Sequence, residues 1–368
     1  QGGGSRPHHY CSHGSQWSTA LELWGAFEQF AGCGEKYSVA FGRDVIASIP
    51  PGSIYFGGSD SGRFVVTALC PSHVKAEPFF TITQNGLADK GYLQHLRSMY
   101  GERIYLPSEQ DSTKVYRDYV EDALRRQKEN QLRPGEFLEE VDGKVHVTGH
   151  LGVMAINGRL SKLVFDQNPE RECYLEESFP LEWMYPHLSP HRLILKINRL
   201  PRSELSDEVV QRDHEYWARY VQSMIGDWLN DDTPLAEVAG FVENVHARHD
   251  LSKFQGDARF VQNDLPQRLF SKLRSSIGGV YSWRVASAKT PAERDRMLKE
   301  ADFAFRQAWA LCPRSPEAVF RYLNALVAQR RFDDAILMAE TALKIEPENI
   351  QLKDLGRELK RMKNSQRS

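Results

Sequence analysis

The sequence has few cysteines, and their spacing excludes two classes of small domain. The five cysteines among 368 residues are an odd number and form no C-x-x-C pair, so we expect neither a dense disulfide scaffold nor a zinc ribbon. Cys70 and Cys312 fall on apolar helical faces, where we expect plain core thiols. Cys11 and Cys33 can pair across an N-terminal helix if the compartment is oxidising.

Long apolar runs are also missing. No run approaches the roughly 18 apolar residues that a membrane span needs, so we expect no span within this chain. The opening stretch "QGGGSRPHHYCSHGS" lacks the basic-then-apolar pattern of a signal peptide. Because Gln1 is not an initiator methionine, we expect that residues have been removed upstream of it.

Neither sign of charge is in large excess. The chain has 47 basic and 49 acidic residues, a net charge of -2, and no long basic run before the tail "RELKRMKNSQRS". We expect that tail to be a solvated helix end, and we expect no nucleic-acid partner. The 41% of hydrophobic and 26% of charged residues are typical of an ordinary globular protein.

The motifs of well-known reactions are absent as well. The sequence contains no G-x-G-x-x-G, no P-loop, no G-x-S-x-G elbow and no kinase or zincin signature. We therefore predict no cofactor, and a binding protein is favoured over an enzyme.

What the sequence does contain is a repeat near its C-terminal end. Pro313 and Pro347 are 34 residues apart, and each is preceded by alanines five and twelve residues earlier. These alanines are Ala308 and Ala301 in the first copy and Ala342 and Ala335 in the second. A 34-residue period with small residues at fixed places is typical of tetratricopeptide (TPR) repeats. We therefore predict an all-α TPR region over residues 267–368, closed by a polar helix.

Physical reasons support this interpretation. Small side chains let two antiparallel helices approach closely, and a proline ends a helix because it has no N–H group. Tyr322 is expected on the inner face of one repeat helix, together with apolar neighbours. Two repeats are too few for an independent solenoid, since stacking supplies the core. They must dock either on the rest of this chain or on another protein, and both alternatives remain open.

The larger first part alternates strand-like and helix-like stretches. Residues 53–58, 78–84, 173–178 and 192–200 are expected to be strands, and the stretches between them, including 180–191, are mostly expected to be helices. This alternation predicts an α/β fold, a Rossmann-like layered domain with a mainly parallel sheet. The predicted domains are an N-terminal arm and amphipathic helix (1–36), the α/β domain (37–204), a long helix and a linker (205–266) and the TPR region.

The stretch "YFGGSDSGRF" is the best candidate for a ligand site. Gly57 and Gly58 follow a strand and open a helix, a position in which backbone N–H groups can face an anion, and Arg63 can add a positive charge. The alternative is a tight strand-to-helix turn that is capped by Ser59 or Asp60. Asp60 would repel a phosphate unless a cation lies between them.

Metal ligands of the right types gather in the opening stretch. His8, His9, Cys11 and His13 lie in a short window that can supply a zinc or copper site. The alternative is an arm that lies along a neighbouring molecule.

Three residue pairs are weaker candidates. His146 with His150 and His246 with His249 have spacings that can share a helix face, but neither pair has a third ligand nearby. Glu176 and Glu177 are near the end of a strand, where neighbouring side chains point to opposite faces, so an acid–base pair is not favoured.

Several phrases together resemble a known family. These are "IPPGSIYFGGSDSGRF", "TITQNGLADKGYLQHLRSMYG", "CYLEESFPLEWMYPHLSPHRLILKINR" and "EADFAFRQAWALCPRSPEAVFRYLNAL". They resemble the C-terminal extracytoplasmic part of bacterial polytopic membrane proteins grouped with protein O-mannosyltransferase-like glycosyltransferases, whose soluble tail often ends in TPR repeats. The membrane half is absent here, so no catalytic residue carries over. The resemblance also leads us to expect glycine where this chain has Arg192.

Two functions follow as expectations. The first is a non-enzymatic protein-interaction or self-assembly module that acts through its TPR helices and N-terminal arm. The second is an accessory domain of a glycosyltransferase-type membrane system that binds a sugar or a lipid phosphate at residues 57–63. The resemblance implies an extracytoplasmic location, either periplasmic, at the cell surface or secreted. An independent hydrolase is the least favoured alternative.

Overall fold

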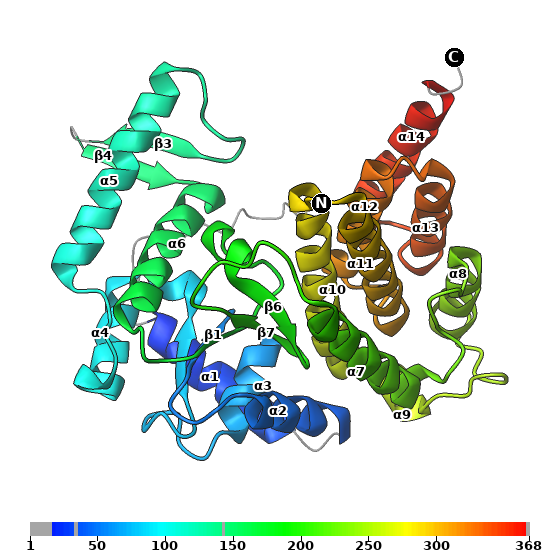
Figure 1. Ribbon diagram of the computed structural model, residues 1–368, viewed down its shortest axis with the longest axis horizontal. Coiled ribbons are helices and arrows are strands. Elements are labelled where there is room, and N and C mark those ends of the chain that lie inside the picture. Colours follow the sequence, from blue (N-terminus) through cyan, green and yellow to red (C-terminus); the bar gives the residue numbers. More distant parts are fainter. Residues whose placement is uncertain (1–16, 33–35, 142–143, 366–368) are drawn as a thin grey trace, which may run out of the picture.

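The centre of the molecule is a five-stranded mixed sheet with helices around it (Figure 1). The computed structural model describes residues 17–32, 36–141 and 144–365. The strand order is β2-β1-β5-β7-β6, in which β1 pairs in parallel with β2 and β5, while β7 is antiparallel to β5 and β6. The strands are β1 (Ile54–Gly57), β2 (Phe80–Thr83), β5 (Cys173–Glu176), β6 (Leu188–His191) and β7 (Ile194–Ile197).

The predicted α/β character is confirmed, but the sheet is mixed and not mainly parallel. The difference arises in residues 180–191, which were expected to be one short helix. They form a 3-10 helix, η3 (Glu182–His187), followed directly by β6. Pro190 is tolerated in β6 because β6 is an edge strand, where a missing N–H breaks no interior ladder.

The turn between β6 and β7 contains a residue with unusual backbone geometry. Arg192 has a φ of 55°, in the left-handed region that favours glycine. This is the position at which the resemblance of the sequence phrases leads us to expect glycine. The backbone supplies a physical reason for that expectation, and Arg192 occupies the position under strain.

Apolar side chains from strands and helices form one continuous core. Ile54 and Phe56 of β1 pack in this core with side chains from the helices around the sheet, among them Phe41, Val65 and Leu160. The helices that surround the sheet are α1 (Trp17–Gly32), α2 (Lys36–Ser48), α3 (Ser61–Leu69), α4 (Lys90–Tyr100) and α6 (His150–Gln167). Among the described helices, none is both long and apolar enough to cross a bilayer.

A separate lobe projects between β2 and β5 in the chain. It consists of α5 (Glu109–Lys128) and a hairpin of β3 (Phe137–Val141) and β4 (Lys144–Thr148), and it lies at the opposite end of the molecule from the C-terminal helices (Figure 1). Strand β3 was not predicted, because its charged residues give no clear apolar alternation. The chain returns from β4 directly into α6.

The stretch from residue 230 to 266 was expected to be a linker, but it contains packed elements. Leu235 and Val238 of α8 are buried, and α8 packs against α11 and α13. The elements in this stretch are too short to give a readable apolar period, which is why the sequence suggested a linker. They are α8 (Leu235–Val242), the π-helix η4 (Glu243–Ala247) and α9 (Ala258–Val261).

The last third of the chain is helical throughout. Ala301, Ala308, Ala335 and Ala342 are all buried, and Tyr322 is buried with them. Pro313 and Pro347 lie just beyond the ends of α11 and α13, so the 34-residue period marks two successive helical hairpins. The helices are α7 (Asp207–Ile225), α10 (Asp264–Ser287), α11 (Pro291–Leu311), α12 (Pro316–Ala328), α13 (Phe332–Ile345) and α14 (Ile350–Ser365).

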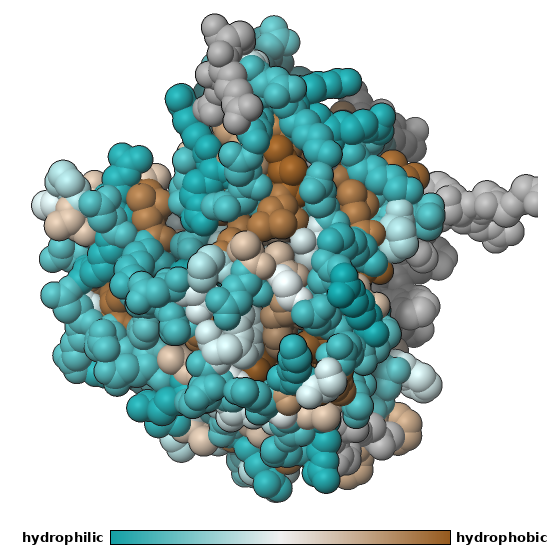
Figure 2. All heavy atoms as spheres, turned by 90° about the vertical axis from the view of Figure 1, so that its right-hand side faces the viewer, coloured by the Kyte–Doolittle hydropathy of each residue, from teal (hydrophilic) through white to brown (hydrophobic). Residues whose placement is uncertain are grey.

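Helix α10 joins the helical part to the sheet. Phe270 packs edge-on against Phe41 of α2, with ring centroids 5.4 Å apart. The fully buried Arg274 pairs with Asp213 of α7 at 2.8 Å. The helical hairpins therefore complete their core with the chain's own first part. The outer face of the helical end is mostly hydrophilic, with hydrophobic side chains in several separate patches (Figure 2).

Candidate functional site

The turn after β1 is a capped strand-to-helix turn. Asp60, and not Ser59, is the N-cap of α3, and its Oδ1 accepts a hydrogen bond of 2.9 Å from the Gly62 N–H. The Glu177 carboxylate passes close to Gly58, where a Cβ would lie 2.0 Å from its Oε2. A side chain at residue 58 would therefore require this carboxylate to move.

A buried lysine neutralises this turn from a distant part of the chain. Nζ of Lys272, on α10, lies 2.5 Å from Asp60 Oδ2 and 2.8 Å from Glu176 Oε1. Tyr55 donates a hydrogen bond of 3.2 Å to the other oxygen of Glu176. Sequence reasoning missed Lys272, because nothing in the sequence distinguishes it from the other basic residues of α10.

The carboxylates around Lys272 respond differently to burial. Burial raises the pKa of Glu176 to about 8 and also raises the pKa of Glu177. Burial acts in the same direction on Asp60, but the charge of Lys272 outweighs it and lowers the pKa of Asp60. Glu177 accepts a 2.6 Å hydrogen bond from the Ser178 N–H, and its carbonyl accepts one from Ser276 of α10. The cluster joins the sheet to α10.

Arg63 does not serve the turn as an anion ligand. Its side chain is fully buried, and its guanidinium pairs with Glu22 of α1 and donates to Thr83 Oγ1 at 2.7 Å. Helix α1 can approach this closely because a Cβ on Gly25 would lie 2.6 Å from the Phe64 ring. The sequence suggested that Arg63 binds an anion at the turn. In the structure its charge instead neutralises the buried Glu22.

Glu22 is held as a buried carboxylate. Burial alone would raise its pKa, but the Arg63 charge and further hydrogen bonds outweigh that effect and lower the pKa to about 2. Thr83 donates a 3.0 Å hydrogen bond to Oε1, while His73 and His95 flank Oε2 at 3.8 and 3.9 Å. Glu22 thus carries a negative charge at neutral pH.

A cavity of about 590 Å³, here called the crevice, lies beside these groups. It is at the carboxyl ends of β1 and β2, the edge where open α/β sheets usually bind ligands. Its walls come from α1, the start of α3, the end of β2 with the 3-10 helix η1 (Gln84–Gly86), α4, β4 and α6. The lining residues are Glu22, Ser59, Phe64, Thr83, Asn85, Gly86, Tyr92, Val147, Thr148, Gly149, His150, Val153, Met154 and Asn157.

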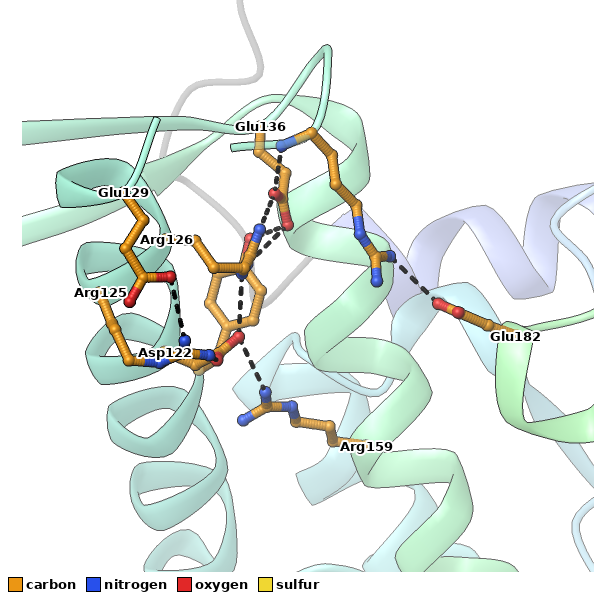
Figure 3. A network of polar contacts seen from close by, with 9 residues as sticks. Asp122, Arg125, Arg126, Glu129, Glu136, Arg159 and Glu182 are labelled. Carbon is orange, nitrogen blue, oxygen red and sulfur yellow. Dashed lines mark hydrogen bonds and ion pairs between the residues drawn. The ribbon is translucent and has the colours of Figure 1, made fainter. Parts of the chain in front are cut away.

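The hairpin that contributes Val147 and Thr148 is anchored by an ionic network (Figure 3). Arg126 of α5 donates to both oxygens of the buried Glu136, and its Nε lies 3.0 Å from Asp122. The Tyr119 hydroxyl donates a 3.0 Å hydrogen bond to Glu136. Hydrogen bonds from Arg126 are the main cause that lowers the pKa of Glu136 to about 2. These contacts hold the β3–β4 hairpin, which forms one wall of the crevice, against α5.

Two other cavities lie elsewhere. One, of about 590 Å³, lies between the start of α3 and the starts of α10 and α12; Asp60, Gly62 and Lys272 line it, together with charges of both signs. Another, of about 440 Å³, adjoins the π-helix η4 and is lined by Trp228 and Phe241 among others. Ser59 of the predicted turn faces the crevice, whereas Asp60 faces the first of these two cavities.

The structure describes two of the predicted groups of histidines, and neither forms a metal site. His8, His9, Cys11 and His13 lie outside the described residues, as do Cys11 and Cys33 as a pair. His146 is exposed on β4 and His150 begins α6, so they do not share a helix face. His246 is buried in η4, whereas His249 lies beyond it, with a φ of 55°. Within the described ranges, no three His, Cys, Asp or Glu side chains are placed to hold a metal ion.

Comparison with known proteins gives no identity. No protein-family model matches the chain, and no curated protein or solved structure matches it. The chemistry of the crevice is therefore the main guide to function. Its apolar walls and fixed hydrogen-bonding groups are suited to recognising an organic molecule.

Proposed function

We propose that this chain is a non-enzymatic binding module whose α/β part holds a small organic ligand in the crevice. The observation that carries the proposal is the position of the crevice at the carboxyl ends of two parallel strands, with apolar walls and a charged carboxylate. Its volume of about 590 Å³ lies in the range of small-molecule sites.

The finer fold assignments belong to the same proposal. The parallel order β2-β1-β5 supports a Rossmann-like origin of the α/β domain, to which the β6–β7 hairpin has been added. The 34-residue period and the buried alanines support a TPR assignment for α10 to α13, with α14 as the closing helix. In this account the helical part is a rigid support that is bound to its own α/β domain.

The setting follows from the resemblance of the four sequence phrases. We place the module in an extracytoplasmic compartment, as an accessory domain of a glycosyltransferase-type membrane system. In such a setting the ligand is a sugar or a lipid phosphate. The buried Arg63 weakens the version in which residues 57–63 bind the phosphate, and the crevice becomes the preferred site.

A crevice-filling variant tests the proposal. Val153→Trp places a large ring in the crevice, whereas Ile350→Trp makes a comparable change at an exposed site on α14. The measurement is thermal shift against hexosides, nucleotide sugars and polyprenyl phosphates. We expect one compound class to stabilise the wild type and Ile350→Trp but not Val153→Trp. Equal responses in both variants, or no response from the wild type at millimolar concentrations, would overturn the proposal.

Self-association through α1 is the second candidate function. Leu23, Trp24, Phe27 and Phe30 are exposed on α1 to between 63% and 69%, and clusters of this kind mark interaction surfaces. The expected partner is a second copy of this chain. Light scattering should show a dimer or larger species for the wild type and for Ile350→Asp, and a monomer for Phe27→Asp. A monomeric wild type would exclude this candidate.

A further inference from the structure

The cavity of about 590 Å³ at the starts of α3, α10 and α12, here called the switch-point cavity, lies where the direction of the strand connections reverses. From β1 the chain crosses through α3 to β2 on one side of β1. Strand β5 lies on the other side of β1, and the strands that follow it, β6 and β7, lie farther from β1. Asp60, Ser61 and Gly62 line the cavity just beyond β1, and Ser178 lines it just beyond β5. Open α/β sheets bind ligands at such a reversal, beyond the carboxyl ends of the strands.

Two serine hydroxyls in this lining have no partner within the described residues. Ser178 is 4% exposed, and its backbone is held by Glu177, which accepts from its N–H, and by Arg321, which donates to its carbonyl. Its hydroxyl makes no hydrogen bond to a described residue, and the oxygen is not sealed from solvent. The hydroxyl of Ser61, the first residue of α3, is likewise unpaired and borders the same cavity. A ligand in the cavity can supply the missing partners.

Two arginines in the lining have positive charge that the protein hardly uses. Arg314, in the loop between α11 and α12, is exposed and forms no ion pair with a described residue. Arg268 of α10 is also exposed, and its ion pair with Asp264 spans 3.8 Å, which is too long for a hydrogen bond. Guanidinium groups present several N–H donors in a geometry that matches the oxygens of a phosphate.

The carboxylates in the same lining are engaged by the protein itself. Asp60 lies 2.5 Å from Nζ of Lys272 and also caps α3. Glu317 accepts a hydrogen bond of 3.0 Å from the Ser315 hydroxyl. Asp264 lies in the first turn of α10, where the helix dipole favours a negative charge. The groups that remain available to a ligand are therefore mainly hydrogen-bond donors.

We infer that the switch-point cavity is a second binding site, which takes the phosphate group of a phosphomonoester. Arg268 and Arg314 supply charge-assisted hydrogen bonds, and the hydroxyls of Ser61 and Ser178 donate to the remaining oxygens. A monoester fits because its three terminal oxygens can all accept from these four side chains. The site includes Ser61 of the turn predicted from the sequence, but its cations come from α10 and the loop before α12 and not from Arg63.

This site goes beyond the proposed function and does not depend on it. The crevice and the switch-point cavity share no lining residue among those that the structure describes. Methyl hexosides carry no phosphate and therefore report on the crevice alone. Inorganic phosphate reports on the switch-point cavity, so the failure of one site is distinguishable from the failure of the other.

Isothermal titration of the full chain with inorganic phosphate at low ionic strength tests the site. We expect saturable binding to the wild type and at least about tenfold weaker binding to Arg314→Gln. Arg294→Gln is the matched control, because Arg294 is exposed near the start of α11 and does not line the cavity. Absence of binding to the wild type at millimolar phosphate, or an equal loss in Arg294→Gln, would overturn the inference.

A second variant tests the buried hydroxyl. Ser178→Ala removes a group that makes no hydrogen bond to the described residues, so we expect a normal melting temperature. Phosphate binding should be about fivefold weaker, as the loss of one hydrogen bond implies. An unchanged affinity would show that Ser178 is not a ligand of the phosphate.

Two phosphomonoesters distinguish a soluble ligand from a lipid headgroup. Displacement of inorganic phosphate by glycerol 3-phosphate would assign a soluble ester. Co-sedimentation with vesicles that contain phosphatidic acid, lost in Arg314→Gln, would assign a lipid headgroup. Binding of inorganic phosphate without binding of either ester would overturn the assignment to a monoester.

Discussion

At the scale of single residues, the molecule is organised by buried charges that have partners. Arg63 with Glu22, Lys272 with Asp60, and the Glu136 network each bring together charges that would be unfavourable alone in a low-dielectric interior. Each set also joins segments that are far apart in the chain. The free energy of unfolding that is lost when one partner is substituted therefore tests how strongly these segments are held together.

Lys272→Met is expected to destabilise the fold strongly. The substitution keeps the apolar stem but leaves the partly exposed Asp60 without its cation and the buried Glu176 without its hydrogen-bond partner, which should cost roughly 2–3 kcal/mol. Lys299→Met is the control, because Lys299 is exposed and its ion pair with Asp231 should contribute less than about 1 kcal/mol. Urea denaturation measures both values. Similar losses in the two variants would contradict the account of the turn.

Acid should weaken the Glu136 network in a defined range of pH. The folded-state pKa of Glu136 is lowered to about 2, below its unfolded value of about 4.3. Its contribution to stability is therefore complete above about pH 4.3 and is lost as the pH falls toward 2. We expect Glu136→Gln to be less stable than the wild type by roughly 2–3 kcal/mol at pH 7 and by less at pH 3. A difference that does not depend on pH would argue against an ionised Glu136.

At the scale of elements, the sequence predicts well wherever a pattern is local. Strands β1, β2, β5 and β7 follow apolar stretches, and the cap at Asp60 follows from a polar residue between glycines and a helix. Strands β3 and β6 and helix α8 are not predicted from the sequence, because they are short, charged or contain proline. The sheet is mixed because β6 and β7 form a hairpin, which the alternation of strands and helices does not reveal.

The candidate site is predicted less well than the fold, for a related reason. The turn at residues 57–63 is contiguous and can be read from the sequence, but its partners Lys272 and Glu22 come from distant helices. The crevice is built from segments as far apart as α1 and α6, none of which carries a motif. Such a site depends on tertiary packing, which composition and periodicity do not encode.

The strained turn at Arg192 gives a prediction at this scale. An L-residue in the left-handed region costs roughly 1–2 kcal/mol, and glycine removes that cost while it adds flexibility to the unfolded chain. We expect Arg192→Gly to stabilise the protein by about 0.5–1 kcal/mol. Arg219→Gly, at an exposed position inside α7, should instead lose about 1 kcal/mol. Thermal unfolding of the two variants measures the contrast, and a loss in both would show that Arg192 is not strained.

At the scale of the whole molecule, α10 is shared by the α/β part and the helical part. Its buried face contacts α2 and the sheet on one side and α11 on the other. The helical hairpins therefore have no complete core when they are separated from the rest of the chain. The α/β part of the same chain supplies the packing surface that these hairpins lack.

This arrangement predicts how fragments behave. A fragment of residues 264–365 should show little cooperative unfolding in urea, because the face of α10 that packs on the sheet is then exposed to water. The full chain should unfold with a clear cooperative transition. A fragment that unfolds as cooperatively as the full chain would show that the hairpins form a self-sufficient domain.

The most direct test of the central claim is methyl nuclear magnetic resonance of the full chain titrated with methyl hexosides. The account predicts that a binding hexoside shifts the methyl signals of Val147, Val153 and Met154, which line the crevice. The signals of Ile225 and Val245, beside the separate cavity at η4, should stay in place. Shifts confined to Ile225 and Val245, or no shifts with any hexoside, would contradict the account.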